Sequence, residues 1–216
     1  MLKNKKTFFL ALLAILALFC FTPLGALPAL GPIVATLATI PVIIAAQLLG
    51  TKAGAVMGFF GGLFSLIVWT FMPPNPAVAF VFTPFYTQAE ISGNFASILI
   101  SFMPRIFTGV AVGLSYGRLS KAFASNQILC FSISAIVGSL ANTLGVMGGI
   151  WLFFGEQYAS VFENAMPLIM LSTILINGIP EAIVAAVASL VVCLPLYEIK
   201  RKQESFMDAS RHFSPR

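Results

Sequence analysis

Residues 53–71 read AGAVMGFFGGLFSLIVWTF, a run without one charged side chain. A helix of about 20 apolar residues crosses the roughly 30 Å of hydrocarbon in a bilayer. Similar runs recur along the chain, and hydrophobic residues make up 59% of the sequence whereas charged residues make up 9%. A water-soluble domain of this length cannot hide so much apolar surface. The sequence therefore predicts an all-α integral membrane protein.

The apolar runs predict six transmembrane helices joined by short connections. They cover residues 7–24, 31–49, 53–71, 95–116, 128–153 and 166–199. The last two runs are longer than a span needs, so we expect tilt or an extension along the interface. Residues 1–199 thus form one membrane domain, and residues 200–216 form a polar cytoplasmic tail without an assigned function.

Charge placement predicts the orientation of the chain. Basic residues lie at the two ends and at alternate connections, namely Lys3, Lys5, Lys6, Lys52, Arg118, Lys121, Lys200, Arg201 and Lys202. The opposite connections carry Glu90, Glu156 and Glu163 and no basic residue. The positive-inside rule then places both termini in the cytoplasm. Because these charges fix orientation, they do not indicate a nucleic-acid partner.

Several familiar patterns are incomplete in this chain. Residues 1–28 resemble a signal peptide, but prolines interrupt the cleavage region, so we keep the first run as a span. Residues 50–52 lack the earlier glycine of a phosphate loop, so any ATP must bind another subunit. Cys20, Cys130 and Cys193 lie far apart and are interpreted as core residues, with no metal or cofactor site predicted.

Glycines recur every four residues in two runs, as Gly54, Gly58 and Gly62 and as Gly109, Gly113 and Gly117. Small residues at this spacing line one helix face and let backbones approach closely. Both sets lie toward the predicted cytoplasmic side. We therefore expect tight packing there and a cup that opens outward; ordinary packing without a cup is the alternative.

Two charged residues, Arg105 and Glu181, lie inside apolar runs. An unpaired charge at the bilayer centre costs at least about 2.5–3.5 kcal/mol, so each needs a partner. One possibility is that they pair with each other. The other is that Arg105 binds an anionic ligand, because its planar guanidinium matches a carboxylate, while Glu181 orients the Arg105 side chain. Asn142 and Asn177 lie at similar depth and either join helices or bind ligand hydroxyl and amide groups.

A proline directly precedes each of these two charges. Pro104 and Pro180 cannot donate a helical hydrogen bond, and neither can Pro41 in the second run. We therefore expect the carbonyls of Ile100, Ile176 and Leu37 to lack their helical partners. Such breaks are tolerated in a membrane where they line a cavity or find a neighbouring donor.

The longest predicted outer connection, residues 71–94, is rich in proline and aromatic residues. It either rests on the bilayer or covers a ligand. Trp69, Phe85 and Tyr86 are the side chains expected to close the apolar side of a site.

Four stretches resemble a known family: IPVIIAAQLLGTKAGA at 40–55, GFFGGLFSLI at 58–67, FTPF at 82–85 and FMPRIFTGV at 102–110. They are similar to the S components of energy-coupling factor (ECF) transporters, the small membrane subunits that capture vitamins, and within that family to the pantothenate group. The resemblance implies a six-helix S-component bundle in a bacterial plasma membrane, with no enzymatic activity of its own. It also implies a membrane coupling subunit and two ATPase subunits as partners, and delivery of the vitamin by toppling of the S component.

The resemblance also suggests roles for the residues named above. Arg105 is expected to take the pantothenate carboxylate, and Asn142 and Asn177 its amide or hydroxyl groups. Ala11, Ala14 and Ala17 lie in the first helix, which contacts the coupling subunit in this family, although their three-residue steps depart from the family's four-residue motif.

The sequence leaves three alternatives to this function. Another vitamin such as riboflavin would use aromatic stacking more than Arg105. A stand-alone secondary transporter would show an inverted repeat, and none is visible in the sequence. An intramembrane enzyme is disfavoured because the spans contain no His or Asp and Glu181 is the only acid near mid-membrane.

Overall fold

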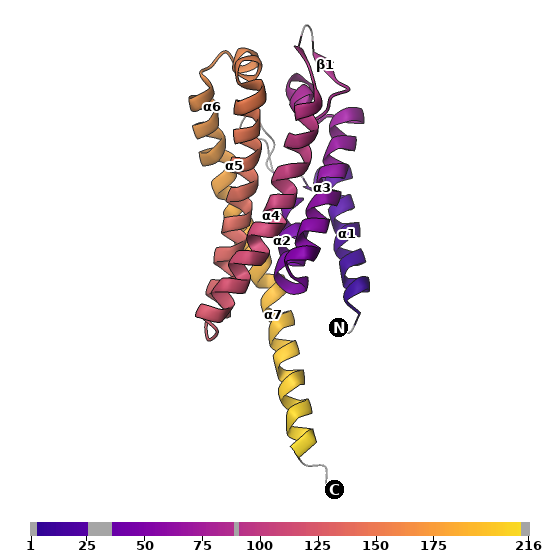
Figure 1. The fold of residues 1–216 in the computed structure, drawn as a ribbon, viewed down its shortest axis with the longest axis vertical. Coiled ribbons are helices and arrows are strands. Elements are labelled where there is room, and N and C mark those ends of the chain that lie inside the picture. Colours follow the sequence, from indigo (N-terminus) through magenta and orange to yellow (C-terminus); the bar gives the residue numbers. More distant parts are fainter. Residues whose placement is uncertain (1–3, 26–35, 89–90, 213–216) are drawn as a thin grey trace.

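The computed structural model describes residues 4–25, 36–88 and 91–212, which form an elongated bundle of helices (Figure 1). The longer helices are α1 (Lys5–Phe21), α2 (Thr39–Leu49), α3 (Thr51–Phe71), α4 (Phe95–Ala122), α5 (Gln127–Phe162), α6 (Met166–Thr173) and α7 (Ile179–His212). The short elements are η1 (Pro23–Gly25), η2 (Pro76–Val81), the π-helical η3 (Ile174–Gly178), and the strands β1 (Thr87–Gln88) and β2 (Ile91–Ser92), which pair antiparallel.

Four stretches of helix are long and apolar enough to cross a membrane: α3, α4, α5 and the continuous segment Met166–Gln203. The chain is therefore a multi-pass membrane protein by length and composition. The six-span count also needs α1, which has 17 residues, and α2, which has 11. Since 11 residues rise only about 16 Å, α2 alone is shorter than the hydrocarbon layer, and the count of six stays a prediction.

The second predicted helix begins later than expected. Residues 31–35 of that run, like Glu90, lie outside the described residues, but Thr36 to Ala38 are not helical and α2 begins at Thr39. The reason is that Pro41 falls in the first helical turn, where its missing N–H is not needed. The Leu37 carbonyl accepts a hydrogen bond from the Ile40 N–H at 3.0 Å. Pro41 thus belongs to the start of a helix and does not break one.

The last predicted run is also divided. The π-helical turn η3 separates α6 from α7 and lies just before Pro180, where the chain cannot continue a regular hydrogen-bond ladder. The predicted polar tail, residues 200–216, is largely helical. The backbone of α7 continues to His212 and extends beyond the rest of the bundle (Figure 1).

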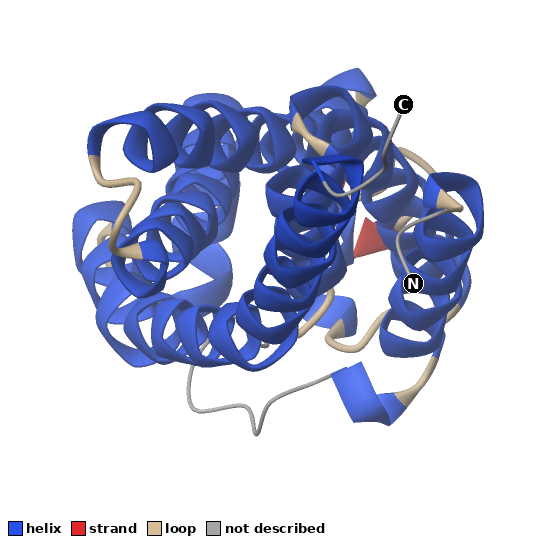
Figure 2. Cartoon of the chain, turned by 90° about the horizontal axis from the view of Figure 1, so that it is seen from below, coloured by secondary structure: helices blue, strands red, loops and turns tan. Residues whose placement is uncertain are grey.

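The two ends of the bundle differ in charge. One end of the bundle holds the start of α1, the α2–α3 turn, the α4–α5 connection and the last turns of α7 (Figure 1). We call it the basic end because it carries Lys5, Lys6, Lys52, Arg118, Lys121 and Lys200. Figure 2 views the bundle from this end. The β1–β2 hairpin lies at the opposite end, which we call the hairpin end. At the α2–α3 turn Gly50 has φ 98°, a conformation that favours glycine.

Glycines bring the backbones of α3 and α4 into close contact. A Cβ atom added at Gly58 would overlap the backbone of Arg105, and one added at Gly109 would overlap the backbone of Gly54. Gly62 and Gly113 face Phe102 and Thr51 in the same way. Gly117 was also expected to be a packing glycine, but no atom of a described residue outside its own helical backbone lies within 4 Å of its Cβ position.

The centre of the long 71–94 connection is part of the protein core. Residues 78–82 are at most 2% exposed and pack between α3, α4 and α5. Ser97 and Ser101, one turn apart on α4, donate hydrogen bonds to the carbonyls of Phe80 and Phe82 at 2.7 and 2.6 Å. The centre of the connection is therefore neither a loop resting on the bilayer nor a ligand cover, because two serines hold it inside the bundle.

The buried side chain of Gln47 joins three helices toward the basic end. Its Nε2 donates to the Phe131 carbonyl at 3.0 Å and to Ser134 Oγ at 2.9 Å on α5. Its Oε1 accepts from Ser189 Oγ at 2.7 Å and from Cys193 Sγ at 3.2 Å on α7. Both donors and both acceptor positions of the amide are thus used, as a buried amide in a membrane protein requires.

We expect Gln47→Leu to destabilise the protein by about 2 kcal/mol, because four contacts of about 0.6 kcal/mol each are lost. The measurement is unfolding of the purified protein in mixed detergent micelles. Gln157→Leu, at an exposed position on α5, is the matched control and is expected to be neutral. Equal stability of the two variants would contradict a structural role for the amide.

Candidate substrate-binding cavity

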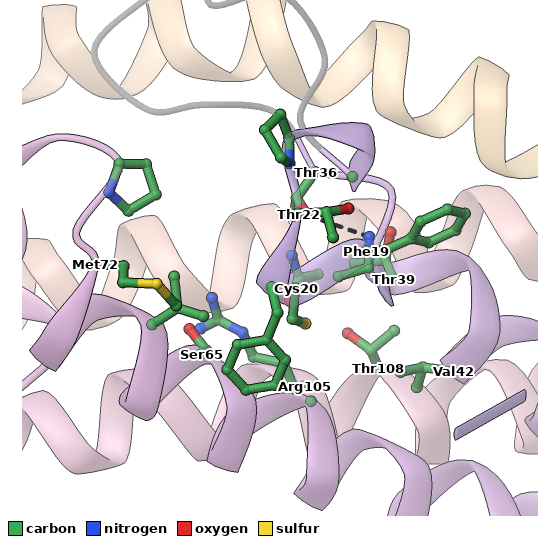
Figure 3. A pocket seen from close by; sticks show the side chains of 18 residues that line it. Phe19, Cys20, Thr22, Thr36, Thr39, Val42, Ser65, Met72, Arg105 and Thr108 are labelled. Carbon is green, nitrogen blue, oxygen red and sulfur yellow. Dashed lines mark hydrogen bonds between the residues drawn. The ribbon is translucent and has the colours of Figure 1, made fainter. Parts of the chain in front are cut away.

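A cavity of about 400 Å³ lies between α1, α2, α3, α4 and α5 (Figure 3). Its walls come from the last turn of α1, from the residues leading into α2, and from the second half of α3. Arg105, Thr108 and Asn142 line it from α4 and α5, and Met72 and Pro74 line it from the start of the connection that follows α3. Gly61 and Arg105 line the cavity at the level of the Gly58 contact with α4, whereas the Gly54–Gly109 contact lies farther toward the basic end.

The lining is largely apolar with a few polar groups. The polar side chains are Cys20, Thr22, Thr36, Thr39, Ser65, Arg105, Thr108 and Asn142. Arg105 is the single charged residue among the described residues that line the cavity. An apolar pocket with a few fixed polar groups is typical of a small-molecule site, and the cation selects for an anionic ligand.

Two contacts hold the Arg105 side chain. Its Nη1 donates a hydrogen bond to the Ile100 carbonyl at 2.7 Å. Its Cζ lies 5.7 Å from the centroid of the Phe82 ring, within range of a cation–π interaction. Phe82 is in turn stacked on Trp69, with ring centroids 4.4 Å apart. A guanidinium has five N–H donors, so most of them remain for a ligand.

Glu181 is held away from Arg105. Its Oε1 accepts a hydrogen bond from the Thr36 N–H at 2.6 Å, and its Oε2 accepts from Thr143 Oγ1 at 3.4 Å. The described contacts of the two charged side chains do not join them, so the direct pair, one of the two alternatives above, is not formed. The carboxylate instead lies at the start of α2, where backbone N–H groups lack helical partners. It fixes Thr36, which is itself a cavity residue.

The two asparagines differ in position. Asn142 lines the cavity and is 6% exposed, and its Oδ1 has no hydrogen-bond partner among the residues that the structure describes. A buried acceptor without a partner is costly, so this oxygen is suited to a donor on a ligand. Asn177 is buried in the π-helical turn η3 and is not among the cavity residues.

None of the three expected aromatic residues lines the cavity. Trp69 is buried against Phe82 in the core at the hairpin end, and Tyr86 packs on the same core. Phe85 is 75% exposed. The reason is the inward path of residues 78–82, which places Phe82 between Trp69 and the guanidinium.

Sequence reasoning missed most of the small polar side chains of the cavity. Cys20 was expected in the core with Cys130 and Cys193; those two are fully buried, whereas Cys20 lines the cavity beside Arg105 (Figure 3). Thr36, Ser65 and Thr108 were not singled out. In the sequence, each of them is only a hydroxyl residue inside or next to an apolar run. That pattern does not indicate a site, because a hydroxyl in a membrane helix often bonds only to the backbone of its own helix.

Comparison with known proteins identifies the family. The sequence model described as "ECF transporter, substrate-specific component" matches residues 7–193. The chain belongs to this family. The Pantothenic acid transporter PanT of Lactococcus lactis subsp. cremoris is 29% identical over 182 residues, which cover 83% of this chain and 85% of the relative. The protein is therefore the substrate-binding membrane subunit of an ECF transporter, an S component, and a transport subunit without an enzymatic role.

The small residues of α1 lie on its outward face. Ala11 and Ala14 are exposed and Ala17 is half-buried, and Leu10 and Leu18 are 61% and 47% exposed on the same helix. The opposite face buries Leu12 and Leu16. A face of this kind is free for lipid or for another subunit.

The cavity predicts a selective chemical label. We expect a small methanethiosulfonate reagent to modify Cys20 in the folded S component, because its thiol lines the cavity, and to leave the fully buried Cys130 and Cys193 unmodified. Mass spectrometry of peptides measures the modified residue. Cys20→Ser should abolish the label, and modification of either buried cysteine before that of Cys20 would contradict the described cavity.

Proposed function

We propose that this S component captures pantothenate from outside the cell and delivers it to an ECF coupling subunit. ATP is then hydrolysed by two partner ATPase subunits. The S-component family and the similarity to a pantothenic acid transporter support this proposal. The observation that carries the choice of ligand is an arginine with unused donors, the one charged side chain among the described residues that line the cavity.

The chemistry of pantothenate matches the cavity. The ligand has one carboxylate, one amide and two hydroxyl groups. We assign the carboxylate to Arg105 through charge-assisted hydrogen bonds, and an amide or hydroxyl donor to Asn142 Oδ1. The cavity volume of about 400 Å³ falls within the range of roughly 300–1,000 Å³ that is usual for small-molecule pockets.

The other predicted site residues receive supporting roles in this proposal. Glu181 positions Thr36, and Trp69 supports Phe82 and through it Arg105. Asn177, Phe85 and Tyr86 lie outside the cavity lining, so ligand contact through them requires a movement of the protein. The outward face of α1 with Ala11, Ala14 and Ala17 is assigned to the coupling subunit.

The proposed orientation places the basic end in the cytoplasm of a bacterial plasma membrane. Support comes from the basic residues that gather there and from the cavity position toward the other end. In that orientation all six predicted spans cross the membrane, and the Gly54–Gly109 contact of α3 and α4 lies on the cytoplasmic side of the cavity. Toppling of the whole subunit then carries the ligand inward.

Vitamin-dependent stabilisation tests the ligand. Purified S component should gain thermal stability with pantothenate and not with riboflavin, because a ligand that binds only the folded state stabilises it, by an amount that grows with the logarithm of its concentration divided by its Kd. If riboflavin and not pantothenate stabilises the protein, the pantothenate assignment is wrong and the chain is an S component for riboflavin. Ion-driven pantothenate uptake by this chain alone in liposomes would instead establish the secondary transporter.

A further inference from the structure

Pro104 has a specific effect on its neighbour Arg105. Proline has no backbone N–H, and in a helix that N–H would donate to the carbonyl four residues earlier. For Pro104 this acceptor is the Ile100 carbonyl, and Ile100 is 2% exposed, so lipid and water do not reach it readily. The structure shows what replaces the missing donor, since Arg105 Nη1 bonds to the same carbonyl at 2.7 Å.

The proline break therefore acts as an anchor for the cation. The Arg105 side chain leaves the helix one residue after the break and turns back to the free carbonyl, while Phe82 covers one side of the guanidinium. The backbone at the break is itself well supported, because Thr108 Oγ1 donates to the Pro104 carbonyl at 2.8 Å. The remaining N–H groups are left on the cavity side, where Ser65 and Met72 also lie (Figure 3).

We propose that Pro104 is a specificity-determining positioning residue: by freeing the Ile100 carbonyl it fixes the Arg105 guanidinium in the orientation that receives the ligand's carboxylate. This inference rests on the proposed function of the cavity. It adds that the preference for a carboxylate over a neutral group depends on a residue that does not touch the ligand. A flexible arginine would have to lose its rotamer freedom on binding, and the anchor removes that cost beforehand.

Pro104→Ala tests this inference. The alanine introduced by this change has a backbone N–H that can donate to the Ile100 carbonyl, which weakens the tether of Arg105 while favouring the helix. We expect affinity for pantothenate to fall about threefold to tenfold, the factor expected for ordering one long side chain on binding. Affinity for the alcohol analogue of pantothenate, in which a hydroxymethyl group replaces the carboxylate, should not change. Equilibrium binding to the purified S component in detergent measures both.

Controls separate this effect from general changes of the helix. Pro195→Ala also removes a proline from inside a helix, with no arginine beside it, and should leave both affinities unchanged. In an Arg105→Ala background, Pro104→Ala should cause no further loss of the preference for the carboxylate, because the two changes act through one group. The melting temperature of Pro104→Ala should equal or exceed that of the unaltered protein.

The possible results are distinguishable. Unchanged pantothenate affinity in Pro104→Ala overturns the inference, and so does an equal loss for pantothenate and the alcohol, since that indicates a distorted cavity. Either result leaves the proposed function in place as long as Arg105→Ala weakens pantothenate binding. Unchanged pantothenate binding in Arg105→Ala contradicts the proposed carboxylate contact, and the inference falls with it.

Discussion

Arg105→Ala is expected to weaken pantothenate binding about 100-fold or more. The guanidinium is the one cation among the described residues of the cavity lining, and a carboxylate there would accept two hydrogen bonds from it. Hydrogen bonds to charged groups contribute about 1.5–3 kcal/mol each, and each 1.4 kcal/mol is a factor of about ten in affinity. Equilibrium binding of radiolabelled pantothenate to the purified S component measures the loss.

Two further variants show that this loss is specific. Arg118→Ala removes the same charge from an exposed position of the same helix and is expected to bind pantothenate normally. Arg105→Lys keeps the charge but not the planar fork, so it should recover only part of the affinity. If Arg118→Ala weakens binding as much as Arg105→Ala, the effect is one of long-range charge, and the assigned contact is wrong.

Gly109→Val is expected to prevent stable folding. A Cβ atom at this position would overlap the backbone of Gly54 on α3, and a backbone cannot move aside as a side-chain end can. The two helices would have to separate along a contact that also includes Gly58 and Gly62. Overpacking a well-filled interior usually destabilises a protein by about 1–3 kcal/mol. A clash between two backbones should cost at least the upper value of that range.

Gly117→Val is the matched control for this prediction. Gly117 lies on the same helix at the same four-residue spacing, yet the space around its Cβ position is open. Valine is the better helix former of the two residues, so Gly117→Val should fold at least as well as the unaltered chain. The measurement is the fraction of monodisperse protein after detergent extraction. Equal yields for the two valine variants would contradict the described α3–α4 contact.

The comparison of these glycines shows how far sequence reasoning reaches. The four-residue spacing predicts one small face on each of α3 and α4 and close packing there, but not that the two faces meet each other. It cannot predict where the contact ends. Gly117 continues the spacing but lies beyond the partner helix, which begins at Thr51. The contact ends where the α2–α3 turn lies in space, and the spacing of residues along one helix gives no information on the position of that turn.

Cavity residues could be predicted from the sequence where the side chain is of a type that is energetically costly to place in a membrane. A charge or amide inside an apolar run needs a partner, so Arg105 and Asn142 stand out in the sequence, and both line the cavity. The partner of Glu181 was not predictable in this way. The Thr36 backbone N–H that it accepts from is 145 positions away and belongs to the start of another helix.

The aromatic residues show the opposite case. Trp69, Phe85 and Tyr86 have the chemistry of a ligand cover, but their positions depend on the path of the connection after α3. That path is fixed by Ser97 and Ser101, whose hydroxyl groups bond to carbonyls of the connection. A serine in an apolar helix is not distinctive enough to predict such a bond, so only the structure assigns these aromatic residues to the core and the surface.

Native mass spectrometry of the purified S component tests the central claim most directly. After growth with pantothenate and gentle extraction, we predict one retained molecule with the mass of pantothenate per chain, and none in Arg105→Ala. Retention of a different vitamin by the unaltered chain, or undiminished retention of pantothenate by Arg105→Ala, would contradict a cavity in which this arginine binds the pantothenate carboxylate.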